Sequence, residues 1–346
     1  MHDDKFTKGR RGEYRGDFTR DTFDPLRHFS RVLIQQGRLQ LEADNNESDS
    51  IHLHHLRTLG ADLMGPHAAP MASDGTPGEG FKITLDAETF SIAAGHYYVN
   101  GILCENENDD TTYLNQPDWP LTDDEKKAPL PKEPYLVYLD VWERHISYVE
   151  DDYIREKALA GVDTATRAQI VWQVKVLSHS QFKELDVEID DIKNDYEQFL
   201  DILRFVKVLK PGNGRLRARA RRSADKSNDP CLTSPEASYR GAENQLYRVE
   251  IHYDGGADGY RSATFKWSRN NASDIYKITA PAINNSTITL QHLGRDSRCS
   301  LQPNDWVEIV DDDSTLRNRA DALLQIEEVD PENFQVILKN PSATAL

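Results

Sequence analysis

Cysteine, long apolar runs and familiar catalytic motifs are scarce or missing in this sequence. Its 346 residues include three cysteines, Cys104, Cys231 and Cys299, which lie far apart and form no Cys-x-x-Cys pair. That spacing favours neither a disulfide framework nor a zinc knuckle and indicates folding in a reducing compartment. No run approaches the roughly 18 apolar residues of a membrane span, and no signal peptide is visible. We therefore expect synthesis in the cytoplasm and no membrane insertion.

Positive charge is also in short supply. The chain has 41 Lys and Arg against 58 Asp and Glu, a formal net charge of -17. Nucleic-acid binding needs clustered cations, so we expect no nucleic-acid partner. The one basic cluster is Gly214–Arg222, in which arginines alternate with small apolar residues as on one face of a strand. An acidic partner and the protein's own acidic helix are alternative targets for this face, which consists of Arg215, Arg217, Arg219 and Arg221.

Motifs that carry chemistry are missing. The sequence has no GxSxG, HExxH, P-loop or Rossmann glycine pattern. His52 and His55 share a helical face and Asp311–Asp313 follow a strand, but a solvated face and an exposed turn explain them more simply. Asp140 and Glu143 fall on opposite faces of a predicted strand and make a poor acid–base pair. We expect no catalytic residue, metal or cofactor, and a binding or structural role.

The N-terminal part divides into an arm and a helix. Residues 1 to about 43 show no hydrophobic period apart from a short strand-like run at Val32–Ile34, so they are predicted to form an extended arm outside the β cores. A helix is predicted from about Asn45 to Met64, capped by Asp44 with Glu47 and stopped by Gly65-Pro66. Its apolar stripe consists of Leu53, Leu56, Leu59 and Leu63.

The sequence predicts mainly β-strands for the rest of the chain. A period of two runs through residues 81–86, 90–107, 135–150 and 167–178, and it returns between Gly, Asn and Asp turns over 244–339. We predict a mainly β fold with two helices, in which tandem antiparallel β-sandwich or barrel-like domains follow an extended arm and a helix. The predicted divisions are 1–66 (arm and helix), 80–212 (β-rich domain), 213–240 (basic strand and linker) and 241–346 (a second β-rich domain that ends as a fragment would).

A second helix is predicted over about 182–205, at the end of the first β-rich domain. Apolar residues recur there every 3.5 positions on average, for about three heptads, and the other positions are largely acidic. The stripe either packs on the β domain or forms a seam between protomers. Its members are Phe182, Leu185, Ile189, Ile192, Tyr196, Phe199 and Leu203.

Several segments together resemble one family. "GDFTRDTFDPLRHFSRVLIQQGRLQLEADNNE" (Gly16–Glu47) is similar to the opening of a family of uncharacterised bacterial proteins whose genes lie among those for baseplates of phage-tail-like contractile injection systems. The collinear resemblance continues through "GHYYVNGILCENE", "YLVYLDVWERHISYVEDDYIREKALAGVDTATRAQIVWQVKV", "GAENQLYRVEIH", "ATFKWSRNN" and "NDWVEIVDDD". The chain departs from the family at Asn45, where a Trp is expected, and in the acidic helix near 182–205.

The resemblance implies a structural baseplate component rather than an enzyme. Its partners would be other particle subunits, in a homo-oligomer of three or six copies. The protein would be cytoplasmic during assembly and then part of a particle that can be released. We expect contacts through the arm, the basic strand and the acidic helix, at Phe18, Arg20, Arg31, Arg215, Arg217, Arg219, Arg221, Ile189, Ile192 and Tyr196.

Two other functions are alternatives to a structural baseplate role. A tail-fibre-like recognition module would bind glycan through clustered exposed aromatics, but all tryptophans except Trp119 sit in predicted strands and are expected in the core. Those four are Trp142, Trp172, Trp267 and Trp306. A cell-wall or polysaccharide hydrolase would need two converging carboxylates, which no pattern in the sequence indicates.

Overall fold

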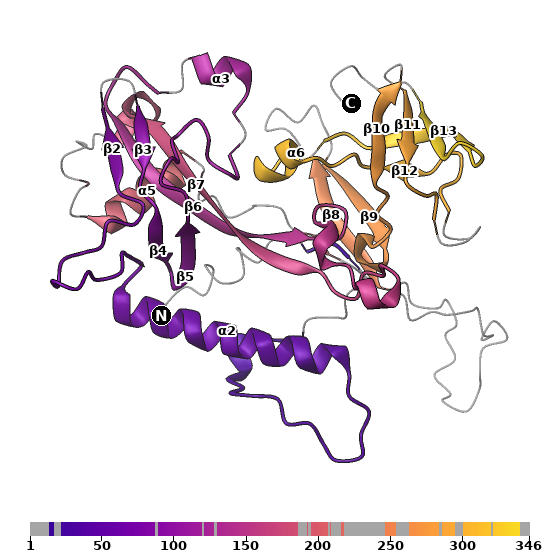
Figure 1. Cartoon of the computed structure of the whole chain (residues 1–346), viewed down its shortest axis with the longest axis horizontal. Coiled ribbons are helices and arrows are strands. Elements are labelled where there is room, and N and C mark those ends of the chain that lie inside the picture. The colour runs from indigo at the N-terminus through magenta and orange to yellow at the C-terminus, as the bar shows by residue number, and fades with distance from the viewer. Residues whose placement is uncertain are drawn as a thin grey trace, which may run out of the picture. The chain divides into compact units, whose positions relative to one another are not determined.

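The computed structural model in Figure 1 has two compact units. Unit 1 comprises Met1–Tyr14, Phe18–Lys210 and Val310–Arg319, and unit 2 comprises Arg15–Asp17, Pro211–Ile309 and Ala320–Leu346. The domains predicted from the sequence differ from these units. Val310–Arg319 falls in the predicted second β-rich domain, whereas the structure groups it with unit 1. The structure describes residues 14–16, 22–86, 89–119, 121–127, 130–185, 192, 195–206, 208, 216–217, 246–253, 263–283, 286–294, 300–319 and 321–339.

The prediction of a mainly β fold is confirmed. Every strand pair in the described part of the chain is antiparallel. In the parts of the chain that the structure describes, the short α-helices α3 and α6 accompany the two predicted ones. The α-helices of the described residues are α2 (Glu42–Met64), α3 (Asp123–Lys127), α5 (Tyr196–Phe205) and α6 (Asp312–Leu316).

Three small sheets are present among the described residues of unit 1. They are β2 (Ile83–Leu85) with β3 (Phe90–Ile92), β1 (His67–Ala68) with β4 (Gly95–Val99) and β5 (Ile102–Asn106), and β6 (Tyr135–Ile146) with β7 (Arg167–Ser178). The β6–β7 hairpin keeps its register over twelve residue pairs, from Tyr135 opposite Ser178 to Ile146 opposite Arg167. Alternate side chains therefore share a face along its whole length.

The main core of unit 1 lies between these sheets. Trp172 of β7 is buried as predicted, meets the ring of Phe81 edge-on at 4.9 Å, and donates from Nε1 to the Glu105 carbonyl at 2.8 Å. Burial raises the pKa of the Cys104 thiol to about 12, so this cysteine packs as an apolar residue. The other buried members are Phe90, Ile92, Val99, Ile102, Tyr113, Val141 and Val174.

The helix predicted over 182–205 is shorter than expected. Lys183–Leu185 is a 3-10 helix, and α5 begins only at Tyr196, where the Asp195 side chain accepts from the Gln198 N–H as an N-cap. An N-cap residue has extended backbone, so one continuous helix through Asp195 is excluded. The stripe nevertheless packs on the β domain. Five residues of the stripe are buried or partly buried against Leu136, Tyr138 and Leu177. They are Phe182, Leu185, Ile192, Phe199 and Leu203.

Helix α6 is bound to the β6–β7 hairpin of unit 1. Gln173 of β7 is fully buried and donates to the Leu316 carbonyl at 3.0 Å, and Arg144 of β6 pairs with Asp312. Asp311 accepts from the Ser314 N–H at 2.7 Å and so caps the helix. The acidic run Asp311–Asp313 is therefore a helix start rather than a simple exposed turn.

Unit 2 contains one larger sheet and one ribbon. The sheet has the order β10 (Ile278–Ile283), β11 (Thr287–Leu290), β14 (Gln335–Leu338), β13 (Leu324–Asp330), β12 (Trp306–Val307), and the ribbon pairs β8 (Tyr247–Tyr253) with β9 (Thr264–Arg269). Ile326 of β13 and Val336 of β14 are essentially inaccessible at the centre of the sheet's core. Unit 2 therefore has a hydrophobic core separate from the clusters of unit 1.

The ion pair between Glu125 of α3 and Arg317 at the end of α6 predicts how the stability of the fold changes at acidic pH. Hydrogen bonds from the Arg317 guanidinium, then from the Thr122 backbone, lower the pKa of Glu125 from 4.5 to about 2. The folded pKa lies below the unfolded one, so this contribution to stability is complete above about pH 4.5 and is lost as the pH falls toward 2. Glu125→Gln should reduce the pH dependence of unfolding in that window, measured by urea denaturation.

The control for this experiment is Glu107→Gln, which removes one exposed carboxylate from the same unit. Glu107→Gln should leave more of the acid dependence in place than Glu125→Gln does. Equal acid profiles for the two variants would show that the Glu125–Arg317 pair, 2.8 Å apart, does not hold α6.

Candidate assembly surface

Helix α2 begins earlier than its sequence predicts. It starts at Glu42, with Leu41 as an N-cap that makes no side-chain bond. The predicted capping box is wrong: Asp44 lies inside the first turn, and Glu47 accepts a hydrogen bond from Thr22 of the arm. An acid in the first turn still faces the positive end of the helix dipole. The predicted stop is confirmed by Gly65, whose φ of 86° ends the helix.

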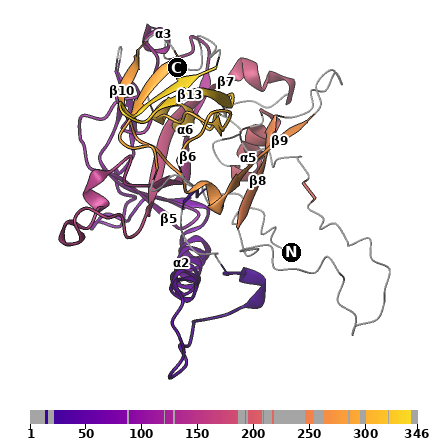
Figure 2. The same ribbon diagram turned by 90° about the vertical axis from the view of Figure 1, so that its right-hand side faces the viewer.

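The face of α2 that meets the β sheets buries few side chains. Only Ala43 and Ile51 are buried in this helix. At Gly60 and Arg57 the helix backbone meets the β4–β5 turn so closely that a Cβ on Gly101 would lie 2.1 Å from the Arg57 carbonyl oxygen. Figure 2 shows α2 nearly end-on below β5. Close backbone approach, rather than a leucine interface, therefore seats this helix.

An ion pair fixes the rotation of α2 about its axis. Arg57 Nη2 lies 2.5 Å from Glu143 Oε1 of β6, and the Tyr14 hydroxyl donates to Glu143 Oε2 at 3.0 Å. The Glu143 side chain is 9 % exposed, so losing its cation would leave a buried charge uncompensated. The side of α2 that carries Arg57 therefore faces the interior of the protein.

The leucine stripe of α2 consequently faces outward. Leu53, Leu56, Leu59 and Leu63 are between 41 % and 78 % exposed. Amphipathic surface helices ordinarily turn such a stripe toward the core. In α2 the arrangement is reversed, and contiguous exposed leucines of this kind mark interaction sites. We call these four residues the leucine face.

The arm that precedes α2 is exposed as well. The predicted strand at Val32–Ile34 is wrong: Thr22–Leu41 contains no strand, and only the short 3-10 helix η1 (Pro25–Arg27) is regular. A strand needs a neighbour for its backbone hydrogen bonds, and none lies beside this segment in the described part of the chain. The large apolar side chains that the arm exposes are Leu26, Phe29, Leu33, Ile34, Leu39 and Leu41.

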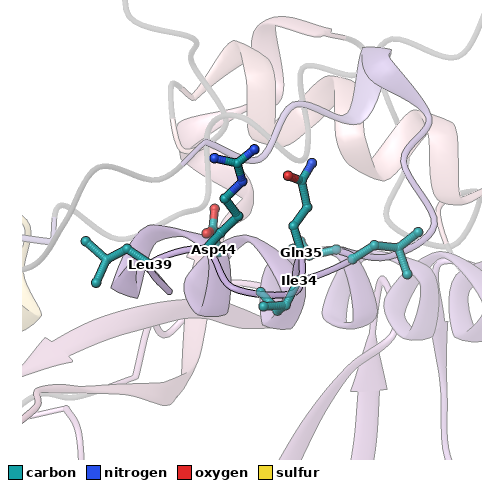
Figure 3. Close-up of a pocket in the computed structure, with 7 residues that line it drawn as sticks. Ile34, Gln35, Leu39 and Asp44 are labelled. Carbon is teal, nitrogen blue, oxygen red and sulfur yellow. The ribbon is translucent and has the colours of Figure 1, made fainter.

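An open pocket lies where the arm doubles back onto the start of α2. Figure 3 shows Ile34, Gln35 and Leu39 of the arm near Asp44 of the helix. Gly37, with a φ of 68°, supplies the turn. The complete lining is Val32, Leu33, Ile34, Gln35, Arg38, Leu39 and Asp44. We call Leu33–Leu39 the arm tip.

The predicted interaction residues are not brought together. Arg31 and Arg217 are exposed, whereas Ile192 is 7 % exposed and packs inside its own chain, which removes it from a seam between protomers. Tyr196 is half-buried against the rings of His67 and Phe199. Outside the described residues lie Phe18, Arg20, Ile189, Arg215, Arg219 and Arg221. Sequence reasoning found the leucine stripe but not its outward direction, which periodicity does not encode.

A second exposed apolar surface lies on the β8–β9 ribbon of unit 2. Val249 is opposite Trp267 and Ile251 is opposite Phe265, and the rings of Tyr247 and Trp267 are 5.8 Å apart. All five side chains are exposed, and Trp267 is 57 % exposed. Trp306 of β12 is 63 % exposed, so the prediction of core positions is wrong for both tryptophans.

The other face of this ribbon is charged. Arg248, Lys266 and Arg15 surround Glu250 and Glu308, with Lys266 Nζ 2.8 Å from Glu308 Oε1. Burial raises the pKa of Glu250, but the nearby cations outweigh it and lower that pKa to about 2. Paired charges thus occupy the side where a core would ordinarily lie, and the apolar side is left open.

Chemistry-bearing groups are dispersed. In the described residues no cluster of three His, Cys, Asp or Glu side chains is placed to hold a metal ion. Asp140 pairs with Lys175 at 2.9 Å, while Glu143 binds Arg57, so these two carboxylates serve separate contacts. None of the helices in the described ranges combines the length and hydrophobicity needed to cross a membrane.

Comparison with known families identifies the chain. A family model matches residues 14–201 and again 196–345, nearly the whole length. The protein belongs to DUF6519, a family of unknown function. No curated protein sequence and no solved structure matches this chain. The exposed surfaces of this DUF6519 protein must therefore be interpreted from their own chemistry.

The close approach of Gly101 to the backbone of α2 gives a direct prediction. Gly101→Ala should cost about 3 kcal/mol or more, because the new methyl overlaps the Arg57 carbonyl and the residue keeps a φ of 73°. Hydrogen–deuterium exchange should become faster throughout α2 while the β6–β7 hairpin stays protected. Urea unfolding measures the loss of stability.

The matched control is Gly161→Ala. Gly161 has a φ of 82°, but no atom lies within 4 Å of the position that an alanine methyl would take there. The change should therefore cost about 1 kcal/mol, from backbone strain alone. If the two variants lost equal stability and α2 exchanged alike in both, close approach at Gly101 would not be what holds the helix.

Proposed function

We propose that this DUF6519 chain is a structural, non-enzymatic component of a phage-tail-like contractile injection particle, placed at or near its baseplate. The proposal rests on one observation above all: a firmly seated helix turns its leucines to solvent. Beside it, the arm exposes further apolar side chains. The resemblance of Gly16–Glu47 to baseplate-associated proteins supports the same conclusion.

The energetics favour a partner over permanent exposure. Burying a leucine side chain contributes about 1.5–3 kcal/mol relative to leaving it in water. The leucine face supplies four such side chains on one rigid element. A partner could therefore gain several kcal/mol from this face at little cost in ordering it. The function would reside in contacts with other particle subunits, made during assembly in the cytoplasm.

Affinity in such a particle would come from many protomers engaged at once. Linked sites raise the effective concentration of each contact without making any single contact stronger. Isolated chains would then bind their neighbours weakly, and the assembled particle would hold them firmly. The chain's net charge of -17 would oppose indiscriminate association outside the particle.

A gene deletion tests the proposal. Particles purified without this protein should lack density at or near the baseplate by electron microscopy and lose host-directed activity. A copy carrying Leu59→Asp should fail to restore the density, because it places charge on the leucine face. Particles that keep all their density and activity without the protein would contradict the proposal.

The matched control is a copy with Leu159→Asp. Leu159 of unit 1 is 58 % exposed and Leu59 is 57 % exposed, so the two changes are equivalent in chemistry and exposure. Leu159→Asp should restore the particle. Failure of both copies would trace the defect to folding or solubility rather than to the leucine face.

A second candidate function is recognition of a surface glycan by unit 2. The exposed Tyr247, Phe265 and Trp267 on one face of the β8–β9 ribbon favour it. Aromatic rings offer broad apolar faces, and Tyr and Trp add a polar group for hydrogen bonding. These properties match the mixed apolar and hydroxyl surface of a sugar. The hydrolase alternative has no comparable support, since Asp140 and Glu143 are engaged in separate ion pairs.

The glycan candidate predicts that binding depends on Trp267. On an array of bacterial surface polysaccharides, the purified chain should bind at least one class, and Trp267→Ala should weaken that binding about tenfold or more. Trp306→Ala is the control, because Trp306 is similarly exposed but lies on a different sheet. Absence of binding to any polysaccharide would remove this candidate and leave the assembly proposal untouched.

A further inference from the structure

We infer that the arm tip of one copy docks on the leucine face of α2 in a second copy of this chain. The inference rests on the proposed assembly function and names the partner of that surface. Both surfaces belong to unit 1, both are apolar and exposed, and they carry opposite charge.

The arm is cationic in a protein that is strongly acidic. Thr22–Leu41 contains three arginines, Arg27, Arg31 and Arg38, against the single acid Asp24. No ion pair joins these arginines to a carboxylate of the described residues, and Arg31 and Arg38 are exposed. Arg31 precedes the arm tip, and Arg38 lies within it, between Gly37 and Leu39. Such a segment suits an apolar surface bordered by acids.

The leucine face has acids of this kind. Asp49 and Asp62 are both exposed on α2. At 100° per residue, Asp62 lies 60° beyond Leu59 at one edge of the leucine face, and Asp49 lies between Leu53 and Leu56 within it. Neither aspartate forms an ion pair with a cation of the described residues. An arm tip lying along the leucines would thus bring arginines to both carboxylates.

A chain's own arm is poorly placed to cover its own leucine face. Its two ends are held on the helix, by Thr22 on Glu47 and by Gln40 on Asn45 at 2.9 Å. The tip lies beside Asp44, in the first turn of α2. The leucine face begins at Leu53, 9 residues further along, and ends at Leu63, 19 residues further along, which is roughly 14 to 28 Å from Asp44 at 1.5 Å per residue. The leucine face accordingly remains exposed, and a second copy is the available donor.

The two surfaces are different patches of one chain, so the contact is head-to-tail. Contacts of this type generate a ring when the rotation between copies closes. Each copy would give its arm tip to the next and receive one on α2. In a closed ring, that arrangement leaves neither the arm tip nor the leucine face unpaired, and it suits the symmetry of a tail-like particle.

Charge exchange tests this contact in the full-length chain. Arg31→Glu with Arg38→Glu should lower the average mass in sedimentation velocity and weaken self-association at least tenfold, because acids would then face Asp49 and Asp62. Asp49→Arg with Asp62→Arg should have the same effect. The variant with all four changes should associate again, since the exchanged charges are complementary in every copy.

Two controls separate the contact from general effects. Lys82→Glu with Lys157→Glu alters the net charge as much as the arm variant does and should leave the mass unchanged. Arg31→Gln with Arg38→Gln adds no repulsion and should weaken association less than the glutamate pair. Circular dichroism and urea unfolding establish that each variant keeps its fold, as exposed positions allow.

The remaining outcomes count against the inference. One such outcome is that the variant with all four charge changes stays dissociated. Another is that the arm variant associates like the wild type while Leu59→Asp does not. Either result would mean that α2 binds something other than the arm tip. A wild-type chain that is monomeric at its highest soluble concentration also overturns the inference. The proposed function would survive these results, because the deletion experiment reads particle density rather than self-association.

Discussion

The ion pair between Arg57 and Glu143 of β6 decides which side of α2, the longest helix in the described residues, meets water. Glu143 is nearly inaccessible, so its charge requires the guanidinium beside it. With Arg57 directed inward and the backbone of α2 resting on Gly101, the leucines have no place in the core. The outward leucine face, and with it the proposed role in assembly, depends on this ion pair together with the close backbone approach at Gly101.

Charge also organises the two units internally. Glu125 of α3 binds Arg317 and Asp312 binds Arg144, and these two ion pairs hold α6 within unit 1, although α6 is distant in sequence from the rest of that unit. In unit 2, a cluster of paired charges occupies one face of the β8–β9 ribbon and leaves the aromatic face open. In both units, polar contacts take positions where apolar packing is usual, and apolar surface is left available to partners.

Those free surfaces are consistent with a protein that completes its packing in an assembly. In an isolated chain the exposed leucines and aromatics reduce solubility and stabilise nothing. A net charge of -17 offsets that hazard by keeping free copies apart. The cationic arm is the exception to this repulsion, which makes it suited to a specific contact between acidic copies.

The sequence alone determined the mainly β fold, the end of α2 at Gly65 and the burial of Trp172, because a period of two, a glycine stop and an apolar strand position are local properties. It also located the leucines, but not their direction. Only the tertiary structure decided that Leu56 and Trp267 face solvent, that Ile192 packs inside its own chain rather than in a seam between protomers, and that Val310–Arg319 joins unit 1. Periodicity relates residues within one segment. Which face of that segment is covered depends on contacts such as Arg57–Glu143, formed by residues far apart in the chain.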